Sequence, residues 1–587
     1  MELDKDVRSR FLHFFNRKGQ VYVWFKRYLT YFFFVIPAVF YFLTACRNPG
    51  WLDATLIVSN VYHFVLGSWV NYHNLFHVLG YGWLKLFPST NIHYYLLLLS
   101  TFLGALTVYL IFLVGIELTS HKLASAIGAL VLMISHSLWW HSTMLEVYTL
   151  NSAIIAAILL CMVRYNKTER IINLYLAVFF FGLGCSNHLY MGLFVFAFLF
   201  VLGALFYKGK ILTLRKTVIL VFCFLIGFSL YLSLFIRDYR IDLRRARSRE
   251  STQLTTDVRI EAFKTTFNDA TGGEVKEHMF PEDMSPEVKR FWRFNYIFWL
   301  VYNFPSAAFF LGIFGFYCFW KKKVYRLTFI FFLVGLAAQI MFSSNYLIPD
   351  MFAFSLPVYI LFSIPLIMAI DFLIERGKAA RVVLLCLLPT FIAPPFIYTA
   401  IPDWSKKPGV VQNYVRNYPE VKQVENTWDP VEYILNPVKR NYTNVSEYAD
   451  RIFTLLPQDA HFWNSDAHSD YPLRYYYQDI YRIRTDLNYH FLFSFYIASE
   501  KLQGEASYMR TCIETGKPVY VVAVEHPIRR VLNQLYLLYH PDDSLDRVSD
   551  LTSDEFIRSF QELEFERVDL FEEEQLYIYR VRKIDSL

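Results

Sequence analysis

Long runs of apolar residues, separated by short polar or basic segments, dominate the chain up to about residue 401. About eleven of these runs approach the roughly 20 residues that an α-helix needs to cross a lipid bilayer. The pattern therefore predicts a polytopic α-helical membrane protein with about 11 transmembrane helices. We place them near residues 28–46, 92–116, 122–140, 149–163, 172–186, 189–206, 217–236, 296–319, 326–342, 352–374 and 381–401.

The pattern changes at about residue 402, beyond which charged residues are dense and no apolar run is long enough to span a bilayer. We therefore divide the chain into a transmembrane domain, 1–401, and a soluble C-terminal α/β domain, 402–587, in which a parallel sheet is one arrangement. The segments that support this division are a helix in "VSEYADRIFTLLP" (445–457), strands in "AHFWNSD" (460–466) and "PVYVVAVE" (518–525), and a closing β-hairpin in "FERVDLFEEEQLYIYRVRK" (565–583).

The distribution of Lys and Arg predicts which side of the membrane each connection faces, because these residues concentrate on the cytoplasmic side. The N-terminal segment and every second connection are basic, whereas the short connections near 141–148, 187–188 and 343–351 contain no Lys or Arg. The N-terminus is therefore expected in the cytoplasm and the C-terminal domain outside, across a bacterial inner membrane or an endoplasmic reticulum membrane. No cleavable signal peptide is expected, since the first run is long enough to stay in the membrane.

Asp53 follows the first predicted span directly, in "RNPGWLDATLIVSNVYHFVLG". Two explanations are open from its position. Asp is a good helix N-cap, and the apolar residues spaced helically after it predict an interfacial helix. Alternatively, a carboxylate at the mouth of a cavity takes a proton from an acceptor hydroxyl as a general base.

Other outer connections also place polar side chains in apolar surroundings. Each side chain on its own has a structural explanation, such as satisfying a tight turn, but an acid at the start of a span usually faces a cavity or a partner. Several such turns on one side predict a shared polar cavity. The candidates are Glu146 and Tyr148 in "SHSLWWHSTMLEVYTLNS" (135–152), Asn187 and His188 in "GLGCSNHLYMG" (182–192), and Tyr346 and Asp350 in "SSNYLIPDMFAFSLP" (343–357).

An arginine cluster breaks the charge rule in the predicted outer loop 237–294, which is expected to be partly flexible. Arginine binds phosphate bidentately and keeps its charge when partly desolvated, so the cluster is a candidate site for a lipid-linked phosphate. The alternatives are an amphipathic segment on anionic headgroups or pairing with the acids that follow. The cluster comprises Arg237, Arg240, Arg244, Arg245, Arg247 and Arg249.

Charge and motif content exclude several other classes. The net charge of +6 does not suggest nucleic-acid binding, because Lys and Arg lie mostly at span ends. Most of the seven Cys lie within spans, so no disulfide framework is expected. His73 and His77 have the spacing of a metal-binding helix face, but no third ligand follows nearby, so no metal site is predicted.

Four short segments resemble, in the same order, the conserved blocks of a family of GT-C glycosyltransferases whose animal member is a protein O-mannosyltransferase of the endoplasmic reticulum. The stretch after the spans, "LLPQDAHFWNSDAHSDYPLRYYYQDIYRIRTDL" (455–487), resembles that family too. The resemblance thus extends over most of the chain. The four segments are "PGWLDA" (49–54), "EVYTLNS" (146–152), "GLGCSNHLYM" (182–191) and "NYLIPDMFAFSLP" (345–357).

The resemblance implies a membrane-embedded transferase with a lipid-phosphate-linked sugar as donor and a catalytic acid in the first outer loop, at Asp53. It makes Glu146, Tyr148, Asn187, His188, Tyr346 and Asp350 cavity residues, and it provides a ligand, the donor phosphate, for Arg237, Arg240, Arg244 and Arg245. Two features depart from the family: Leu56 stands where a second acid is common, and "WVNYHNLFHVLGYGWLKLF" replaces a His-Pro-Pro-Gly-Tyr-Pro-like stretch. Both bear on donor or acceptor choice, so the sugar is left open between mannose and another.

The sequence therefore predicts an inverting glycosyltransferase that moves a sugar from a polyprenyl- or dolichyl-phosphate carrier to a hydroxyl of a protein or glycolipid on the outer face. The alternatives are a transporter or flippase of a lipid-linked saccharide and an envelope scaffold. The predicted partners are the lipid-linked donor, the acceptor and the membrane, with no nucleic acid. No cofactor is assigned, and the need for a divalent metal is left open.

Overall fold

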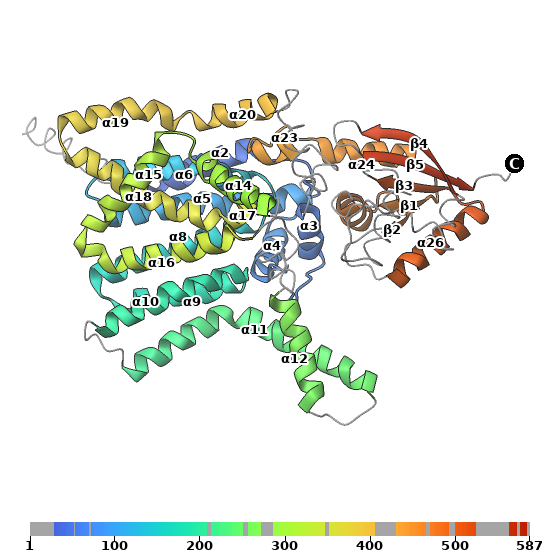
Figure 1. The fold of residues 1–587 in the computed structure, drawn as a ribbon, viewed down its shortest axis with the longest axis horizontal. Helices are drawn as coiled ribbons and strands as arrows, with labels where there is room; N and C mark the ends of the chain where they lie inside the picture. Colours follow the sequence, from blue (N-terminus) through green and yellow to red (C-terminus); the bar gives the residue numbers. More distant parts are fainter. Residues whose placement is uncertain are drawn as a thin grey trace, which may run out of the picture.

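A bundle of apolar helices forms most of the protein, and a smaller sheet-containing part lies at one end of it (Figure 1). The helices α3 and α4 lie between the bundle and the sheet, while α11 and α12 extend to one side. The computed structural model describes residues 29–51, 53–69, 72–207, 213–250, 256–271, 286–346, 351–405, 430–464, 470–491, 499–523, 563–571 and 576–583.

Within the bundle, α8 and α18 are almost wholly enclosed, whereas α11 and α19 present most of their side chains outward. The helices of this part are η1 (Leu29–Tyr31), α2 (Phe32–Thr44), α3 (Ala54–Tyr62), α4 (Asn74–Leu86), α5 (Ile92–Leu118), α6 (Lys122–Met133), α7 (His136–Thr143), α8 (Tyr148–Thr168), α9 (Ile171–Cys185), η2 (Leu189–Leu193), α10 (Phe194–Tyr207), α11 (Leu214–Glu250), α12 (Thr256–Thr271), α14 (Pro286–Asn303), α15 (Ala307–Lys321), η3 (Lys323–Tyr325), α16 (Arg326–Ser343), α17 (Met351–Phe354), α18 (Leu356–Glu375), α19 (Lys378–Phe391) and α20 (Pro394–Ser405).

The predicted count of 11 spans is not confirmed. Among the described residues, 7 helices are long and apolar enough to cross a membrane, or up to 9 if each of two bent pairs is one span. The two bent pairs are α6 with α7, at 60°, and α14 with α15, at 97°. Pro305 lies in the break of the second pair, where it cannot continue the backbone hydrogen-bond ladder. Although α2 and α9 coincide with predicted spans, they are shorter. The chain is an integral, multi-pass membrane protein.

The predicted flexible loop 237–294 is largely helical, which corrects the prediction. α11 continues to Glu250, and α12 and α14 follow, with 251–255 and 272–285 outside the described residues. α12 packs back on α11: the Phe235 and Phe263 rings are 6.0 Å apart, and Thr266 Oγ1 donates to Asp242 Oδ2 at 2.8 Å. The sequence did not predict this packing of α12 on α11, because the segment is rich in charged residues and has few aromatic residues that would indicate a packed face.

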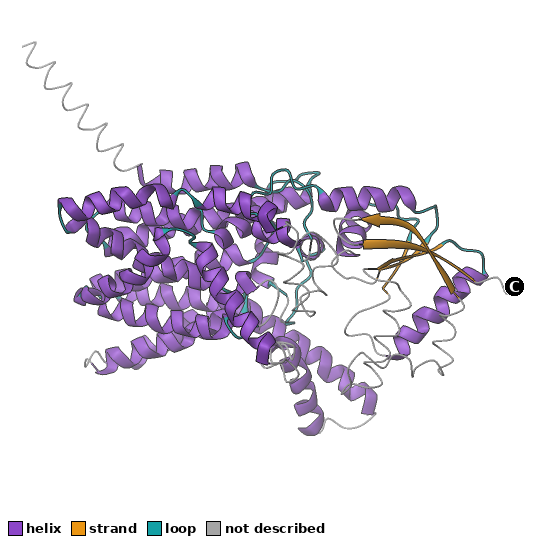
Figure 2. Ribbon diagram, turned by 45° about the horizontal axis from the view of Figure 1, so that its top comes forward, coloured by secondary structure: helices purple, strands orange, loops and turns teal. Residues whose placement is uncertain are grey.

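The sheet has five strands in the order β2-β1-β3-β5-β4. The first three are parallel, and β4 and β5 form an antiparallel hairpin, so the predicted strands and hairpin are confirmed. Figure 2 shows these strands gathered at one end of the helical body. The division at residue 402 stays a prediction. The elements of this part are α23 (Pro430–Leu435), α24 (Asn444–Leu455), β1 (His461–Asn464), the π-helix η4 (Pro472–Ile480), β2 (Asn488–Phe491), α26 (Ser499–Glu514), β3 (Val519–Ala523), β4 (Leu563–Phe571) and β5 (Leu576–Lys583).

Residues 433–442, which we call the connecting segment, fasten the sheet-containing part to the bundle. Its backbone carbonyls accept hydrogen bonds from side chains of α7 and α14 and from Asn48, which lies between α2 and α3. These bonds hold the segment in place against the bent pair α6–α7. They run from Trp140 to Tyr433 (2.7 Å), His136 to Ile434 (2.9 Å), Tyr302 to Leu435 (3.0 Å), Thr143 to Pro437 (2.8 Å) and Asn48 to Tyr442 (2.9 Å).

Candidate functional site

Asp53 occupies the N-cap position of α3, but its side chain makes no capping hydrogen bond. The side chain is exposed, and only its backbone carbonyl joins the helix, by accepting from Ile57 N at 2.7 Å. An N-cap residue stabilises a helix through a bond from its side chain to a first-turn amide. Capping therefore does not account for this carboxylate.

The residues before Asp53 are held tightly against the connecting segment. Trp51 is fully buried, its Nε1 donates to the Tyr442 hydroxyl at 2.9 Å, and its carbonyl accepts from the Tyr433 hydroxyl at 3.3 Å. A Cβ on Gly50 would come within 2.7 Å of Met144 Cε and 3.1 Å of the Tyr433 hydroxyl. A glycine is needed for this close approach, which fixes the start of the first outer loop.

Glu146 lies in the short connection between α7 and α8 and is 9% exposed. Its backbone carbonyl accepts from Ser100 Oγ at 2.8 Å. Burial raises the pKa of the Tyr433 phenol well above its ordinary value, and negative charge on Glu146 and on Asp53 raises it further. The phenol therefore stays protonated, and both predicted acids act on it electrostatically.

Lys439, in the connecting segment, is a fully buried cation. Its Nζ lies 5.1 Å from the ring centroid of Tyr433 and 5.1 Å from that of Tyr442, within cation–π range. Lysine is almost never fully buried without a compensating partner. Nothing in the sequence singles out this residue, because it lies between two weak helical segments and outside every motif.

Tyr148, at the start of α8, is surrounded by histidine rings from three separate elements. Its ring centroid lies 6.3 Å from that of His73, 5.3 Å from His141 and 5.7 Å from His188. His141 is fully buried and uses Nδ1 for a 2.6 Å bond with the Ser137 carbonyl, while its Nε2 has no hydrogen-bond partner among the described residues. An imidazole nitrogen in this position can accept a hydrogen bond from a sugar hydroxyl.

Asn187 joins the turn after α9 to both α4 and α8. Its Oδ1 accepts from Phe76 N at 3.0 Å, its Nδ2 donates to Asn151 Oδ1 at 3.0 Å, and its carbonyl is 3.3 Å from His73 Nδ1. The next residue, His188, has its ring centroid 5.1 Å from that of His73. The hydrogen-bonding groups of Asn187 are therefore largely used within the protein, and the residue positions its neighbours.

His73 was predicted only as a weak metal candidate, yet the structure places it with the cavity residues. Burial lowers its pKa to about 3 and, with the nearby His73, lowers that of His188 well below its ordinary value. Both rings are neutral at pH 7. His77, four residues on, turns instead to the Val65 carbonyl at 3.0 Å. The spacing of the two histidines therefore does not build a metal site between them.

Tyr346 packs against Phe354, which in turn lies beside the rings of His188 and Tyr148. The Tyr346 and Phe354 rings are 4.7 Å apart, and Phe354 lies 5.6 Å from His188 and 5.5 Å from Tyr148. Asp350 lies outside the described residues. The structure thus brings together predicted residues from three outer connections.

The arginines of the predicted phosphate site lie on α11 beside the first outer loop. Arg237 donates to the Leu66 carbonyl and pairs with Asp238, both at 2.7 Å, and Asp238 accepts from Ser68 N at 2.7 Å. Further along α11, Arg244 bonds to the Arg240 carbonyl, and Arg245 bonds to Asp242. All four are exposed. Of the four, Arg237 reaches the first outer loop through its hydrogen bond to the Leu66 carbonyl.

Among the described residues, the group close enough to hold a metal ion is His121, Asp371 and Glu375. Asp371 is fully buried, and the Lys322 ammonium lies 3.2 Å from its Oδ2 and 3.4 Å from Glu375 Oε1. This lysine already forms ion pairs with both carboxylates. The group lies where α6 begins and α18 ends, away from the Tyr148 group.

With this geometry in place, comparisons with known proteins are informative. Residues 73–211 match the model of the N-terminal domain of the protein O-mannosyl-transferase TMEM260. No curated protein matches the chain. The matched range includes Glu146, Tyr148, Asn187 and His188.

The fold resembles a solved structure over nearly its whole length. ArnT from Cupriavidus metallidurans bound to undecaprenyl phosphate aligns with a TM-score of 0.51 and 11% identity, over 93% of this chain and 97% of that one. The apo form of the same protein aligns with a TM-score of 0.49 and 12% identity, over 96% and 98%. The predicted resemblance is confirmed. The chain is similar to GT-C O-mannosyltransferases, and its fold is ArnT-like.

Proposed function

We propose that the protein transfers a sugar, with mannose as the first candidate, from a polyprenyl or dolichyl phosphate to an acceptor hydroxyl on the outer face of the membrane. Two findings support a lipid-phosphate donor: the family match, and the likeness to a protein solved with undecaprenyl phosphate. The observation that carries the proposal is the arrangement around Tyr433. There the Tyr433 hydroxyl donates to the Trp51 carbonyl, two residues before an Asp53 carboxylate that does not cap its helix. Gly50 lies against Met144, two residues before the buried Glu146, so the chain segments that carry the two acids meet at this point.

In the proposed reaction, Asp53 accepts the proton of the acceptor hydroxyl as a general base. The acceptor oxygen attacks the anomeric carbon of the sugar from the face opposite the carrier. The bond between that carbon and the phosphate oxygen breaks, and its electron pair leaves with the lipid phosphate, so the configuration inverts. Arginines at the outer end of α11, namely Arg237, Arg240, Arg244 and Arg245, stabilise the charge that develops on the leaving group.

Around the sugar, the neutral rings of His141 and His188 and the Tyr148 hydroxyl supply hydrogen-bonding groups in apolar surroundings. Glu146 binds a sugar hydroxyl or holds Tyr433 in place. Asn187 positions His73 and His188. Tyr346, which packs on Phe354, completes the outer wall of the site. Asp350 stays a predicted substrate-binding residue. Such a mixture of aromatic walls and a few polar groups is typical of small-molecule sites.

The decisive test is glycosyl transfer by the purified protein, with polyprenyl-phosphate mannose and polyprenyl-phosphate glucose as alternative donors. Asp53→Asn keeps the shape of the side chain and removes the base, so transfer should fall at least about a hundredfold. The matched control is Asp450→Asn, because Asp450 is an exposed acid on α24. Equal activity of the two variants would remove Asp53 as the base. No transfer with any lipid-linked sugar, together with movement of such a lipid across vesicles, would instead favour a flippase.

A further inference from the structure

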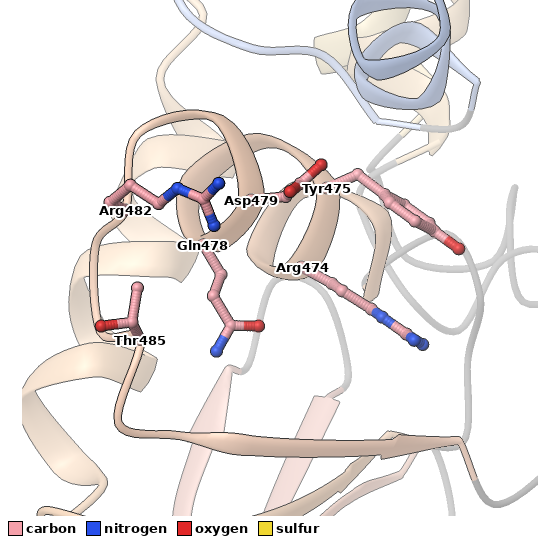
Figure 3. A pocket seen from close by; sticks show the side chains of 6 residues that line it. All are labelled: Arg474, Tyr475, Gln478, Asp479, Arg482 and Thr485. Atoms are coloured by element: carbon pink, nitrogen blue, oxygen red, sulfur yellow. The ribbon is translucent and has the colours of Figure 1, made fainter. Parts of the chain in front are cut away.

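A polar pocket lies on the sheet-containing part, at the π-helix η4 and the turn that follows it. Its volume is about 320 Å³, near the lower end of the roughly 300–1,000 Å³ range of ligand pockets. It is lined by Arg474, Tyr475, Gln478, Asp479, Arg482 and Thr485. Figure 3 shows Arg474 and Tyr475 extending side by side from the helix, with Arg482 beside Asp479 and Thr485 on the turn below.

The backbone at this pocket has two uncommon features. A π-helix is rare and is often found at functional sites. Arg482 and Arg484 both lie in the left-handed region, with φ of 58° and 52°. Non-glycine residues hold this conformation only when their surroundings enforce it.

The surroundings of Arg484 explain how the turn is fixed. Its guanidinium bonds to the Leu456 and Pro457 carbonyls at 2.9 Å each and to Asp486 at 2.8 Å. Gln478 Nε2 adds a 2.8 Å bond to the Leu487 carbonyl. Arg484 is therefore a structural residue. Arg482, two positions earlier on the same fixed turn, is exposed and lines the pocket instead.

The pocket is joined directly to the first outer loop. Asp479 Oδ2 lies 2.7 Å from His63 Nε2, and His63 directly follows the last residue of α3. Asp53 is at the other end of α3, which has 9 residues and thus a length of about 14 Å. Tyr481, at the end of η4, also donates to the Thr90 carbonyl at 2.6 Å. The pocket is thus held at a defined distance from the proposed base.

We propose that this pocket binds an anionic saccharide unit of the acceptor, a sugar that carries a phosphate or a carboxylate. Arg474 and Arg482 offer guanidinium groups for the anion, whose geometry suits bidentate pairing. Tyr475 offers a ring face for the sugar, and Gln478 and Thr485 offer groups for its hydroxyls. With two arginines and one aspartate, the lining has a net positive charge. The proposal rests on the proposed function, since it names the class of acceptor.

Binding is tested first, on the full-length protein in detergent, by titration calorimetry with glucose 6-phosphate, glucuronic acid and glucose. We expect both anionic sugars to bind at least tenfold more tightly than glucose. Arg474→Gln combined with Arg482→Gln should weaken anionic binding at least tenfold. Arg580→Gln, which alters an exposed arginine on β5, should leave it unchanged. Equal binding of glucose and glucose 6-phosphate, or equal behaviour of the two variants, would overturn the proposal.

Transfer assays distinguish a failure of this inference from a failure of the proposed function. They also show whether the pocket binds the acceptor or the donor. If the pocket holds the acceptor, the double variant raises KM for an anionic acceptor and leaves KM for the lipid-linked donor and kcat unchanged. A raised donor KM would overturn the assignment to the acceptor. If the wild-type protein transfers no sugar at all, the proposed function fails, and the binding titration still decides whether the pocket recognises anionic sugars.

Discussion

Lys439 places a positive charge inside the protein, between two tyrosine rings of the connecting segment. Tyr433, one of these two, is also the residue whose hydroxyl experiences the charges of Glu146 and Asp53. A nearby cation favours the ionised form of a carboxylate. We therefore expect Lys439→Met, which keeps the volume and removes the charge, to shift the acid limb of the pH–rate profile of transfer upward by about half a unit to one unit.

Lys439→Arg retains the charge and should return the profile toward that of the wild type, which a purely structural role would not require. Lys517→Met, at an exposed lysine in the sheet-containing part, is the matched control. If Lys439→Met lowers activity equally at every pH, the lysine supports packing alone.

At the same scale, the sequence predicts residues that lie in recognisable motifs and misses those that reach the site only through folding. Tyr148, Asn187 and His188 lie close together, because each lies at a turn at the same end of the bundle, while their place in a substrate cavity stays a prediction. His73 and Lys439 were missed for different reasons. His73 was considered only for its metal-binding spacing with His77. Lys439 lies next to Tyr433 only because a segment distant in the sequence folds back over α7.

At the scale of elements, α4 carries a buried histidine whose ionisation opposes folding. His77 is 1% exposed, and burial lowers its pKa to about 4, compared with about 6.5 in an unfolded chain. Between these values the unfolded state binds more protons, so stability falls as the pH drops below about 6.5. The loss from this one residue is about 2 kcal/mol at pH 5.

His77→Asn removes this titration and retains an N–H donor for the Val65 carbonyl. We expect the melting temperature of the variant in detergent to decrease less between pH 7 and pH 5 than that of the wild type. A parallel decrease in the two proteins would show that His77 does not contribute to the acid sensitivity.

The elements also show where periodicity is informative. The sequence predicts the helices within apolar runs well, since their composition alone requires burial in lipid or protein. The bend between α6 and α7 was not predicted, although it turns α7 across the site and positions His141 and the connection to Glu146. It depends on packing against the connecting segment, which lies nearly 300 residues further along the chain.

At the scale of the whole molecule, the site and the pocket at η4 lie at the same end of the bundle, since the connecting segment and η4 both contact the loop that contains Asp53. The basic connections, including that at Lys323, lie at the opposite end, near the buried Asp371. Lys and Arg of short loops remain in the cytoplasm during insertion. The positive arginines at the outer end of α11 oppose this rule, so the orientation needs a direct test.

We expect β5 to lie outside and the connection between α15 and α16 to lie in the cytoplasm. In a background without native cysteines, Arg580→Cys and Lys323→Cys each place one thiol at an exposed position on these two segments. A membrane-impermeant maleimide applied to intact cells or sealed vesicles should label residue 580 at once and residue 323 only after permeabilisation. The reverse pattern would place Asp53 in the cytoplasm. A donor whose sugar is presented on the outer face would then be excluded, because the base and the sugar would be separated by the bilayer.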